Sequence, residues 1–325
     1  MGCFWGGGPW LILEESLPVA GDIDGDRDRV LVQLAKLRQH QRDGRRSPHK
    51  PLLVLLALGR LAATGSSRLR WDDAHVDLGN LIAEFGPVSK TARIQSAAYP
   101  FTRLRSDGIW TLDRDVPMDN IGPLAAEHVT GSLSPHVERV LSADPNLIVS
   151  AARALVESHF PASIAPDVLL AVGLDPDTVL HAQQTLPGTA LETPRQRDPK
   201  WRADIIQAWD RQCAFCDFDG GLYGGTVGID AAHVCWSAFE GPDSLDNGLA
   251  LCALCHKLFD RGALGIDLDL RVCVSKTFNA RTSTGRLVYK LHHKPIQGRP
   301  GTPHPAASHT NWHREQVFKG QPLDT

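Results

Sequence analysis

The chain has 325 residues, and its 34 basic and 37 acidic side chains leave a net charge of −3 at pH 7. This length exceeds one ordinary domain, so we expect two domains. The composition is typical of a soluble globular protein, and no apolar run is long enough to span a bilayer, which argues against a membrane-embedded protein.

The first predicted elements are a leader and two helices. Residues 1–29 contain an apolar patch that Gly and Pro interrupt and no basic segment precedes, so we expect a flexible leader and not a signal peptide. Residues 30–41 have apolar residues at helical spacing. In the next helix Ser47 can cap the start and Gly65 can end it. Its middle, Leu52 to Leu58, is apolar all round, which predicts a central buried helix.

A hairpin and further helices complete the first domain. Residues 101–112 hold two short apolar runs around an Asp-Gly pair, which predicts a β-hairpin. Helical spacing also occurs at residues 76–87, 136–144, 146–160 and 163–174. Residues 183–200 are polar and contain proline, so we expect a linker there. The prediction is a mainly α N-terminal domain with a small β-hairpin over residues 30–182 and a second domain over residues 201–325.

Four cysteines in two Cys-x-x-Cys pairs dominate the second domain. They are Cys213, Cys216, Cys252 and Cys255. Four thiolates in two close pairs suit a closed, structural, tetrahedral Zn²⁺ site. A helix at residues 201–212 leads into the first pair, and short strands are expected at residues 249–252 and 272–275. Three cysteines remain, and without a secretion signal this favours a reducing compartment, with the cytoplasm as the default localisation.

Two histidines and an asparagine accompany the cysteines: His233, Asn247 and His256. With both cysteine pairs, this series resembles the HNH endonucleases of the McrA-like kind, which have an α+β, zinc-stapled ββα-metal core. The resemblance covers about residues 201–267. It implies that His233 is the general base, that Asn247 holds the loop or orients His233, and that His256 binds a catalytic Mg²⁺ or Mn²⁺ ion. An imidazole that titrates near neutrality suits proton transfer from water.

One acidic residue follows on the same helix. Asp260 lies four residues after His256 and hence on the same helix face, so we expect it to be a second ligand of the catalytic ion. A pairing with Arg261 or another surface group is the alternative. Many relatives carry an acidic residue directly before the base histidine, where this chain has Ala232, and the nearest acid is Asp230.

Two segments of the first domain carry candidate DNA-binding residues. His49 and Lys50 stand at the start of the buried helix, where amide groups and the helix dipole favour a phosphate. Residues 97–105 place apolar residues beside arginines. Together these segments resemble the sulfur-binding domain of phosphorothioate-dependent, type IV restriction endonucleases, in which this domain precedes an HNH nuclease. The resemblance covers roughly residues 30–170.

This second resemblance implies a pocket for the sulfur of a phosphorothioate. Sulfur is more weakly hydrated than oxygen, so an apolar wall of Ala98, Tyr99 and Pro100 costs it less desolvation. His49 and Lys50 would hold the remaining phosphate charge. The basic residues expected to reach the backbone or base edges are Lys90, Arg93, Arg103 and Arg105. From composition alone, packing in the core is the other interpretation of the apolar wall.

Charge is segregated along the chain. Residues 30–115 hold 14 basic and 8 acidic side chains, net +6, and residues 276–325 hold 8 and 2, again net +6. Residues 201–275 hold 5 and 11, net −6. The basic blocks could contact phosphates and the acidic block could attract cations, while a solvated face is the alternative for each run.

The sequence therefore predicts a restriction endonuclease that recognises double-stranded DNA with phosphorothioate linkages and hydrolyses phosphodiester bonds nearby. The alternatives are an HNH endonuclease that reads another mark, such as a methylated base, or an unmodified site, and a non-catalytic zinc-containing DNA-binding module. A domain that reads a flipped base would want an aromatic cage, and residues 30–185 hold two Trp and one Tyr. HNH cores cut one strand, so a double-strand break requires a homodimer or two visits, and both remain open.

Overall fold

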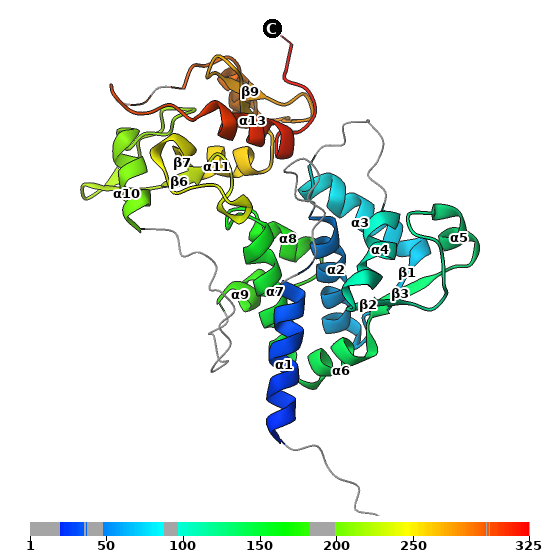
Figure 1. Ribbon diagram of the computed structural model, residues 1–325. Helices are drawn as coiled ribbons and strands as arrows, with labels where there is room; N and C mark the ends of the chain where they lie inside the picture. Colours follow the sequence, from blue (N-terminus) through cyan, green and yellow to red (C-terminus); the bar gives the residue numbers. More distant parts are fainter. Residues whose placement is uncertain are drawn as a thin grey trace, which may run out of the picture.

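The computed structural model describes residues 20–35, 37, 48–87, 97–181, 199–296, 298 and 300–324. These residues form an N-terminal lobe (residues 20–181) and a C-terminal lobe (residues 199–324), as Figure 1 shows. Each lobe has its own hydrophobic core. Within the described ranges, no helix combines the length and the apolar character needed to cross a membrane. Most of the predicted linker lies outside the described residues.

A central helix organises the N-terminal lobe. The helix α2 (His49–Thr64) has ten buried residues between Lys50 and Leu61, as its all-round apolar pattern predicts. It packs against α3 (Trp71–Phe85), α4 (Ala98–Arg103) and α7 (Pro145–His159). Gly65 ends it with a φ of 73°, and its N–H donates to Leu61 O over 2.8 Å. The other helices are α1 (Ala20–Ala35), α5 (Ile121–Ala126), α6 (Pro135–Ala143), α8 (Ala165–Ala171) and α9 (Pro176–His181).

Two predictions for this lobe are corrected. The leader expected over residues 1–29 ends early, because α1 begins at Ala20 and packs along α7. The hairpin expected over residues 101–112 does not form: α4 continues into a 3₁₀ turn (Leu104–Asp107). Phe101 and Leu104 are both fully buried, and a spacing of three residues places both on one helical face.

A small sheet forms in place of the hairpin. The strand β2 (Trp110–Leu112) pairs with β3 (Thr130–Leu133), which pairs on its other side with β1 (Leu69–Arg70). The sheet is antiparallel in the order β1–β3–β2. The predicted mainly α class is confirmed, and its β component comes from three short strands that are distant in sequence.

The C-terminal lobe is built on a ββα unit, as predicted. The strand β6 (Ile229–His233) pairs antiparallel with β7 (Gly248–Cys252), and α11 (Ala253–Asp260) follows directly. The helix α10 (Pro199–Ala208) packs against both strands. A Cβ atom at Gly248 would lie 2.1 Å from Ile205 Cδ1, so any larger residue here would force the Ile205 side chain to shift. The remaining elements include β4 (Gly221–Leu222), β5 (Gly225–Thr226), β8 (Leu264–Ile266), β9 (Val272–Val274), α12 (Ser283–Arg286) and α13 (Ala307–Gln316).

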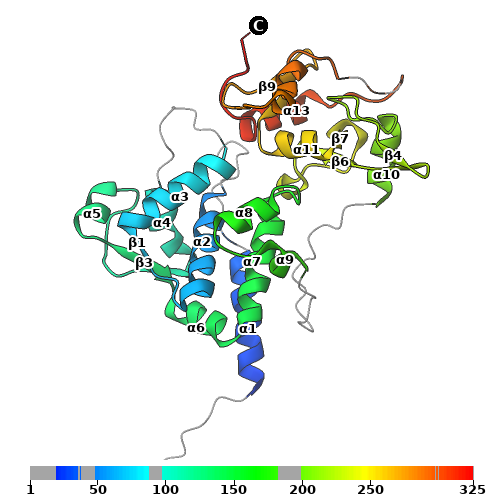
Figure 2. The same cartoon turned by 180° about the vertical axis from the view of Figure 1, so that it is seen from behind.

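The lobes meet where α11 faces α8 and the end of α3, and both views place α11 above α8 (Figure 1, Figure 2). Two side chains of the C-terminal lobe, Trp236 and Val317, belong to the core of the N-terminal lobe. Around them, Lys257 Nζ lies 2.8 Å from Asp167 Oδ2, and Arg261 pairs with Glu84. An apolar centre with a polar rim therefore joins the helix that carries His256 to the N-terminal lobe.

Candidate active site and DNA-binding face

The four cysteines converge on one point. Cys213 and Cys216 follow α10, Cys252 ends β7, and Cys255 lies in the first turn of α11. Their sulfur atoms all lie within 4.8 Å of one another, and the Cys216 and Cys252 sulfurs are 3.7 Å apart. Metal–sulfur bonds of about 2.3 Å in a tetrahedron imply an edge of about 3.8 Å. The cluster therefore suits a metal ion such as zinc, as the spacing predicts.

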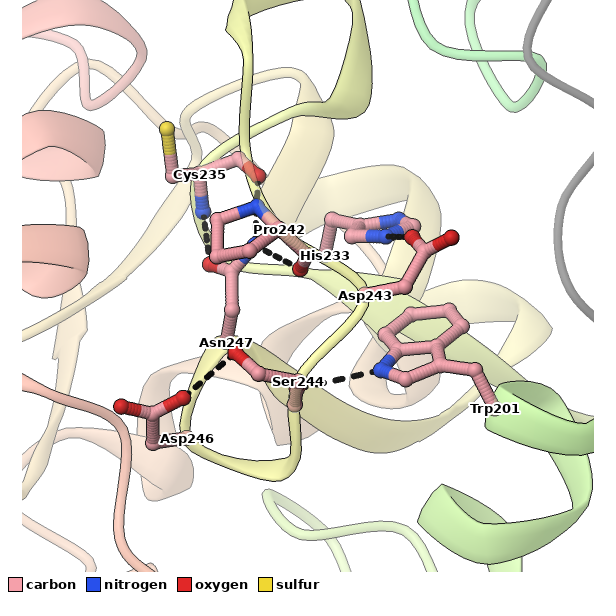
Figure 3. Close-up of polar contacts among 8 residues, drawn as sticks. All are labelled: Trp201, His233, Cys235, Pro242, Asp243, Ser244, Asp246 and Asn247. Atoms are coloured by element: carbon pink, nitrogen blue, oxygen red, sulfur yellow. Dashed lines mark hydrogen bonds and ion pairs between the residues drawn. The ribbon is translucent and has the colours of Figure 1, made fainter.

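His233 stands at the end of β6, beside this cluster's strand β7, and only 6% of its surface is exposed. Its Nε2 atom lies 2.8 Å from Asp243 Oδ1. Its ring stacks on the indole of Trp201, with centroids 3.9 Å apart and planes inclined by 15°. Figure 3 shows the Asp243 carboxylate at the edge of the imidazole and Trp201 on α10 beside it.

Asn247 holds the loop between β6 and β7 and is fully buried. Its Nδ2 donates to Cys235 O over 3.0 Å and to Pro242 O over 2.9 Å. Its Oδ1 accepts from Cys235 N over 2.8 Å. Of the two roles expected for Asn247, these contacts are those of a residue that holds the loop.

His256 and Asp260 lie on one face of α11, as their spacing predicts. His256 Nε2 is 3.2 Å from Asp260 Oδ2, and this carboxylate also accepts from Trp236 Nε1 over 3.0 Å and from Ser163 Oγ of the other lobe. Burial alone would raise the pKa of Asp260, but the hydrogen bonds from His256 and Ser163 hold it below its usual range. A metal ion bound to Asp260 would have to displace these donors, so the contacts of Asp260 are those of a partner that orients His256.

Asp230, the acidic residue that precedes His233 most closely in the sequence, pairs with an arginine. Asp230 Oδ1 accepts from Arg202 Nε over 2.7 Å on the exposed side of β6. Within the described residues, the four cysteines are the sole group of three or more His, Cys, Asp or Glu ligand atoms close enough to hold an ion. Any second ion would therefore need few protein ligands, as Mg²⁺ does when phosphate oxygens and water complete its shell.

A candidate DNA-binding face lies where α4 meets the start of α2. The rings of His49 and Tyr99 meet edge to face, with centroids 6.4 Å apart. The Arg103 guanidinium lies over the Tyr99 ring at 4.8 Å and forms a two-pronged pair with Asp119. The sequence segments around His49 and Tyr99, fifty residues apart, are thus brought together as expected.

Other residues of the predicted sulfur pocket have different surroundings. Lys50 is buried and pairs with Asp107, so its charge is already neutralised inside the protein. Ala98 and Pro100 are buried, and Ala98 belongs to the core. Arg105 donates to Thr102 O and Val116 O and pairs with Asp115. Lys90 and Arg93 lie outside the described residues.

Comparison with known families assigns both lobes. A family model described as "ScoMcrA-like, DNA sulfur-binding domain" matches residues 27–177, and a second, "HNH endonuclease", matches residues 213–267. The chain joins a DNA sulfur-binding domain to an HNH endonuclease domain. The sulfur-binding match coincides with the N-terminal lobe, and the endonuclease match contains all four cysteines, His233, Asn247 and His256.

Solved structures with the same kinds of domain show low similarity. The sulfur-binding domain of ScoMcrA complexed with phosphorothioated DNA is 21% identical, with a TM-score of 0.40, over 46% of this chain and 97% of that one. The corresponding SprMcrA domain is 24% identical, with a TM-score of 0.38, over 46% and 96%. The type IV phosphorothioation-dependent restriction endonuclease ScoMcrA is 12% identical, with a TM-score of 0.34, over 81% and 97%. No curated protein matches the chain.

The sequence alone did not single out two contacts of the nuclease domain. Asp243 follows His233 by ten residues, and Trp201 precedes it by 32. Both residues are found only when the loop after β6 and the helix α10 fold over the same ring. No periodic or compositional signal marks either of them.

Proposed function

We propose that this protein is a restriction endonuclease that binds phosphorothioated DNA through its sulfur-binding domain and hydrolyses phosphodiester bonds through its HNH domain. The observation that carries the proposal is the presence in one chain of a match to a DNA sulfur-binding domain and a match to an HNH endonuclease. One domain supplies selection and the other supplies chemistry. Cutting is then expected at some distance from the modification, because the residues for the two tasks lie on different lobes.

In the nuclease domain we assign the role of general base to His233. It accepts a proton from the water molecule whose oxygen attacks phosphorus and forms a new bond to it. The bond between phosphorus and the leaving oxygen then breaks, and the leaving oxygen takes up a proton. Asn247 holds the loop that borders His233. His256 would hold a divalent ion, Mg²⁺ or Mn²⁺, together with phosphate oxygens. When bound, such an ion polarises the phosphate and stabilises the charge on the leaving oxygen.

In the sulfur-binding domain we assign the phosphorothioate to the face made by His49, Tyr99 and Arg103. The partly exposed ring of Tyr99 offers polarizable apolar surface to sulfur, and Arg103 sets a positive charge over the same ring. Sulfur loses less hydration than oxygen at such a surface, so the modified linkage is preferred. Lys50 stabilises this face from beneath through Asp107 and does not need to touch DNA.

A reader of methylated bases has less support in this chain. The two tryptophans of the N-terminal lobe, Trp71 and Trp110, are 3% and 2% exposed and pack on Phe101 in the core. They are therefore committed to packing and are not available as the walls of a base cage.

The test uses one duplex in three forms: unmodified, and with either configuration of a single phosphorothioate, since the sulfur makes phosphorus chiral. We expect binding and Mg²⁺- or Mn²⁺-dependent cutting of one phosphorothioate form, with weaker binding of the other two. Equal cutting of all three duplexes would refute recognition of sulfur. A supercoiled plasmid with the same modification separates nicked from linear product and so reports cutting of one strand or both.

Two variants divide the proposal between the domains. His233→Ala should retain selective binding and lose cutting by about 100-fold or more, the usual contribution of general-base catalysis. Tyr99→Ala should lose at least about 10-fold of the binding preference for sulfur, or about 1.4 kcal/mol. Tyr223→Ala is the matched control, because Tyr223 is fully exposed on the turn between β4 and β5 of the other lobe.

A further inference from the structure

The contact between His233 and Asp243 determines which ring nitrogen can act as a base. His233 Nε2 lies 2.8 Å from Asp243 Oδ1, and both side chains are largely buried, with 5% and 15% of their surfaces exposed. An ionised carboxylate can only accept hydrogen bonds, so the neutral imidazole carries its hydrogen on Nε2. Nδ1 is then the basic nitrogen. After Nδ1 has taken a proton, the same carboxylate stabilises the imidazolium.

The backbone on both sides of Asp243 is held by side chains of the nuclease core. On one side, Asn247 Nδ2 donates to Pro242 O over 2.9 Å. On the other side, Trp201 Nε1 donates to Ser244 O over 3.0 Å, as Figure 3 shows. The backbone of Asp243 is therefore held between two anchored carbonyl groups, which keeps its side chain within reach of His233.

Trp201 acts on the pair in two ways. Its indole covers one face of the imidazole, with ring centroids 3.9 Å apart, so the ring cannot rotate freely about its χ2 bond. Its Nε1 atom anchors the residue next to Asp243. One side chain from α10 thus restricts the base itself and also the turn that orients the base.

We propose that Asp243 and Trp201 are positioning residues for the base His233, and that Asn247 contributes to catalysis by anchoring the turn that carries Asp243. The proposal rests on the proposed nuclease function, in which His233 accepts the proton of the attacking water. Asp243 sets the tautomer with hydrogen on Nε2, and Trp201 sets the plane of the ring. Neither residue has to touch the DNA or the divalent ion.

The test is a double-mutant cycle on full-length protein, with single-turnover cutting of the phosphorothioate duplex as the readout. Asp243→Asn keeps the shape but removes the charge and the preference for one tautomer. We expect the cutting rate at saturating DNA to fall roughly 10- to 100-fold, as for partners that orient functional histidines, with DNA affinity unchanged. In a His233→Ala background, the same substitution should have no further effect. Asp243→Glu, which keeps the charge, should recover part of the rate.

Two further variants keep the proposal falsifiable if Asp243→Asn folds poorly. Asp246→Asn is the matched control: Asp246 accepts from Ser244 Oγ over 2.5 Å in the same turn, and we expect its variant to cut at nearly the wild-type rate. Trp201→Phe keeps an aromatic ring on His233 but removes the bond to Ser244 O, and we expect an intermediate loss of rate.

Each result bears on one of the two proposals. If Asp243→Asn cuts as wild type while His233→Ala is inactive, the positioning role is wrong and the nuclease proposal stands. The positioning role is also wrong if Asp243→Asn lowers the cutting rate by the same factor in the wild-type and His233→Ala backgrounds. It is wrong too if Asp246→Asn lowers the cutting rate as much as Asp243→Asn does. Either result would assign Asp243 to folding alone. If His233→Ala cuts as wild type, the proposed role of His233 fails first.

Discussion

His313 provides a stability prediction whose size follows from its surroundings. It lies in α13, is 1% exposed, and stacks on Phe259 of α11 with ring centroids 3.7 Å apart. Its Nε2 donates to Phe259 O over 3.0 Å, and Nδ1 has no hydrogen-bond partner among the described residues. A second ring proton would therefore be buried without an acceptor. Burial lowers the pKa of His313 to about 4 from the ordinary histidine value of 6.5.

The sign and size of the effect follow from this depressed pKa. Between pH 6.5 and 4 the unfolded chain binds a proton at His313 and the folded chain does not, so stability is present above pH 6.5 and is lost as pH falls toward 4. A difference of about 2.5 units corresponds to about 3 kcal/mol in total, of which about 2 kcal/mol is lost by pH 5. His313→Gln cannot titrate, so its free energy of unfolding should fall less on acidification.

The assay is urea unfolding of the full-length protein, in which tryptophan fluorescence follows the C-terminal lobe. It is carried out at pH 7.5 and pH 5.0 on wild type, His313→Gln and His304→Gln. Protonation of the four clustered cysteines affects all three proteins alike, so the difference between proteins isolates one histidine. We expect His313→Gln to lose about 2 kcal/mol less than wild type between the two pH values. The exposed His304 serves as the control and should leave the loss unchanged. Equal losses in wild type and His313→Gln would refute the reasoning.

Three more predictions concern the two lobes. Cys213→Ser should lower bound zinc in metal analysis and unfold the C-terminal lobe, while selective DNA binding by the other lobe persists; a folded, active variant would contradict a structural metal. Asn247→Ala leaves buried backbone groups without partners, so it should cost about 3 kcal/mol or more in chemical unfolding, and an unchanged midpoint would argue against the loop-holding role. Lys257→Ala combined with Arg261→Ala should loosen the contact between the lobes, which small-angle scattering would record as a larger radius of gyration; identical curves would show that the apolar centre suffices.

Local rules of chain geometry account for what the sequence predicted correctly. Each Cys-x-x-Cys pair places two thiols close enough to share an ion, and a closed Zn²⁺ site needs four ligands, so two such pairs predict the cluster of Cys213, Cys216, Cys252 and Cys255. The apolar pattern of residues 52–58 similarly requires burial on all sides, and α2 is the central helix of its lobe. The ββα unit was expected from the resemblance that these motifs carry.

The wrong hairpin prediction and the unforeseen surroundings of two candidate site residues have a common physical cause, which is contact with distant residues. The Asp-Gly pair at residues 107–108 is a strong local turn signal, but Phe101 and Leu104 gain more by packing into the core as one helical face. Asp260 has the correct helical spacing for a shared ion with His256, yet Ser163 of the other lobe occupies its carboxylate. Lys50 likewise pairs with Asp107, 57 residues away, and does not project from the helix start.

The sequence by itself determined the cysteine pairs and the central helix, since each depends on residue type at short spacing, and its resemblance to HNH endonucleases indicated His233 as the candidate base. Only the tertiary structure decided what surrounds that base. Asp243 and Trp201 contact His233 because a loop and a helix from different parts of the chain close over one ring. Periodicity in a sequence reports which face of an element is buried, whereas the pairing of polar side chains depends on which distant segments the core brings together.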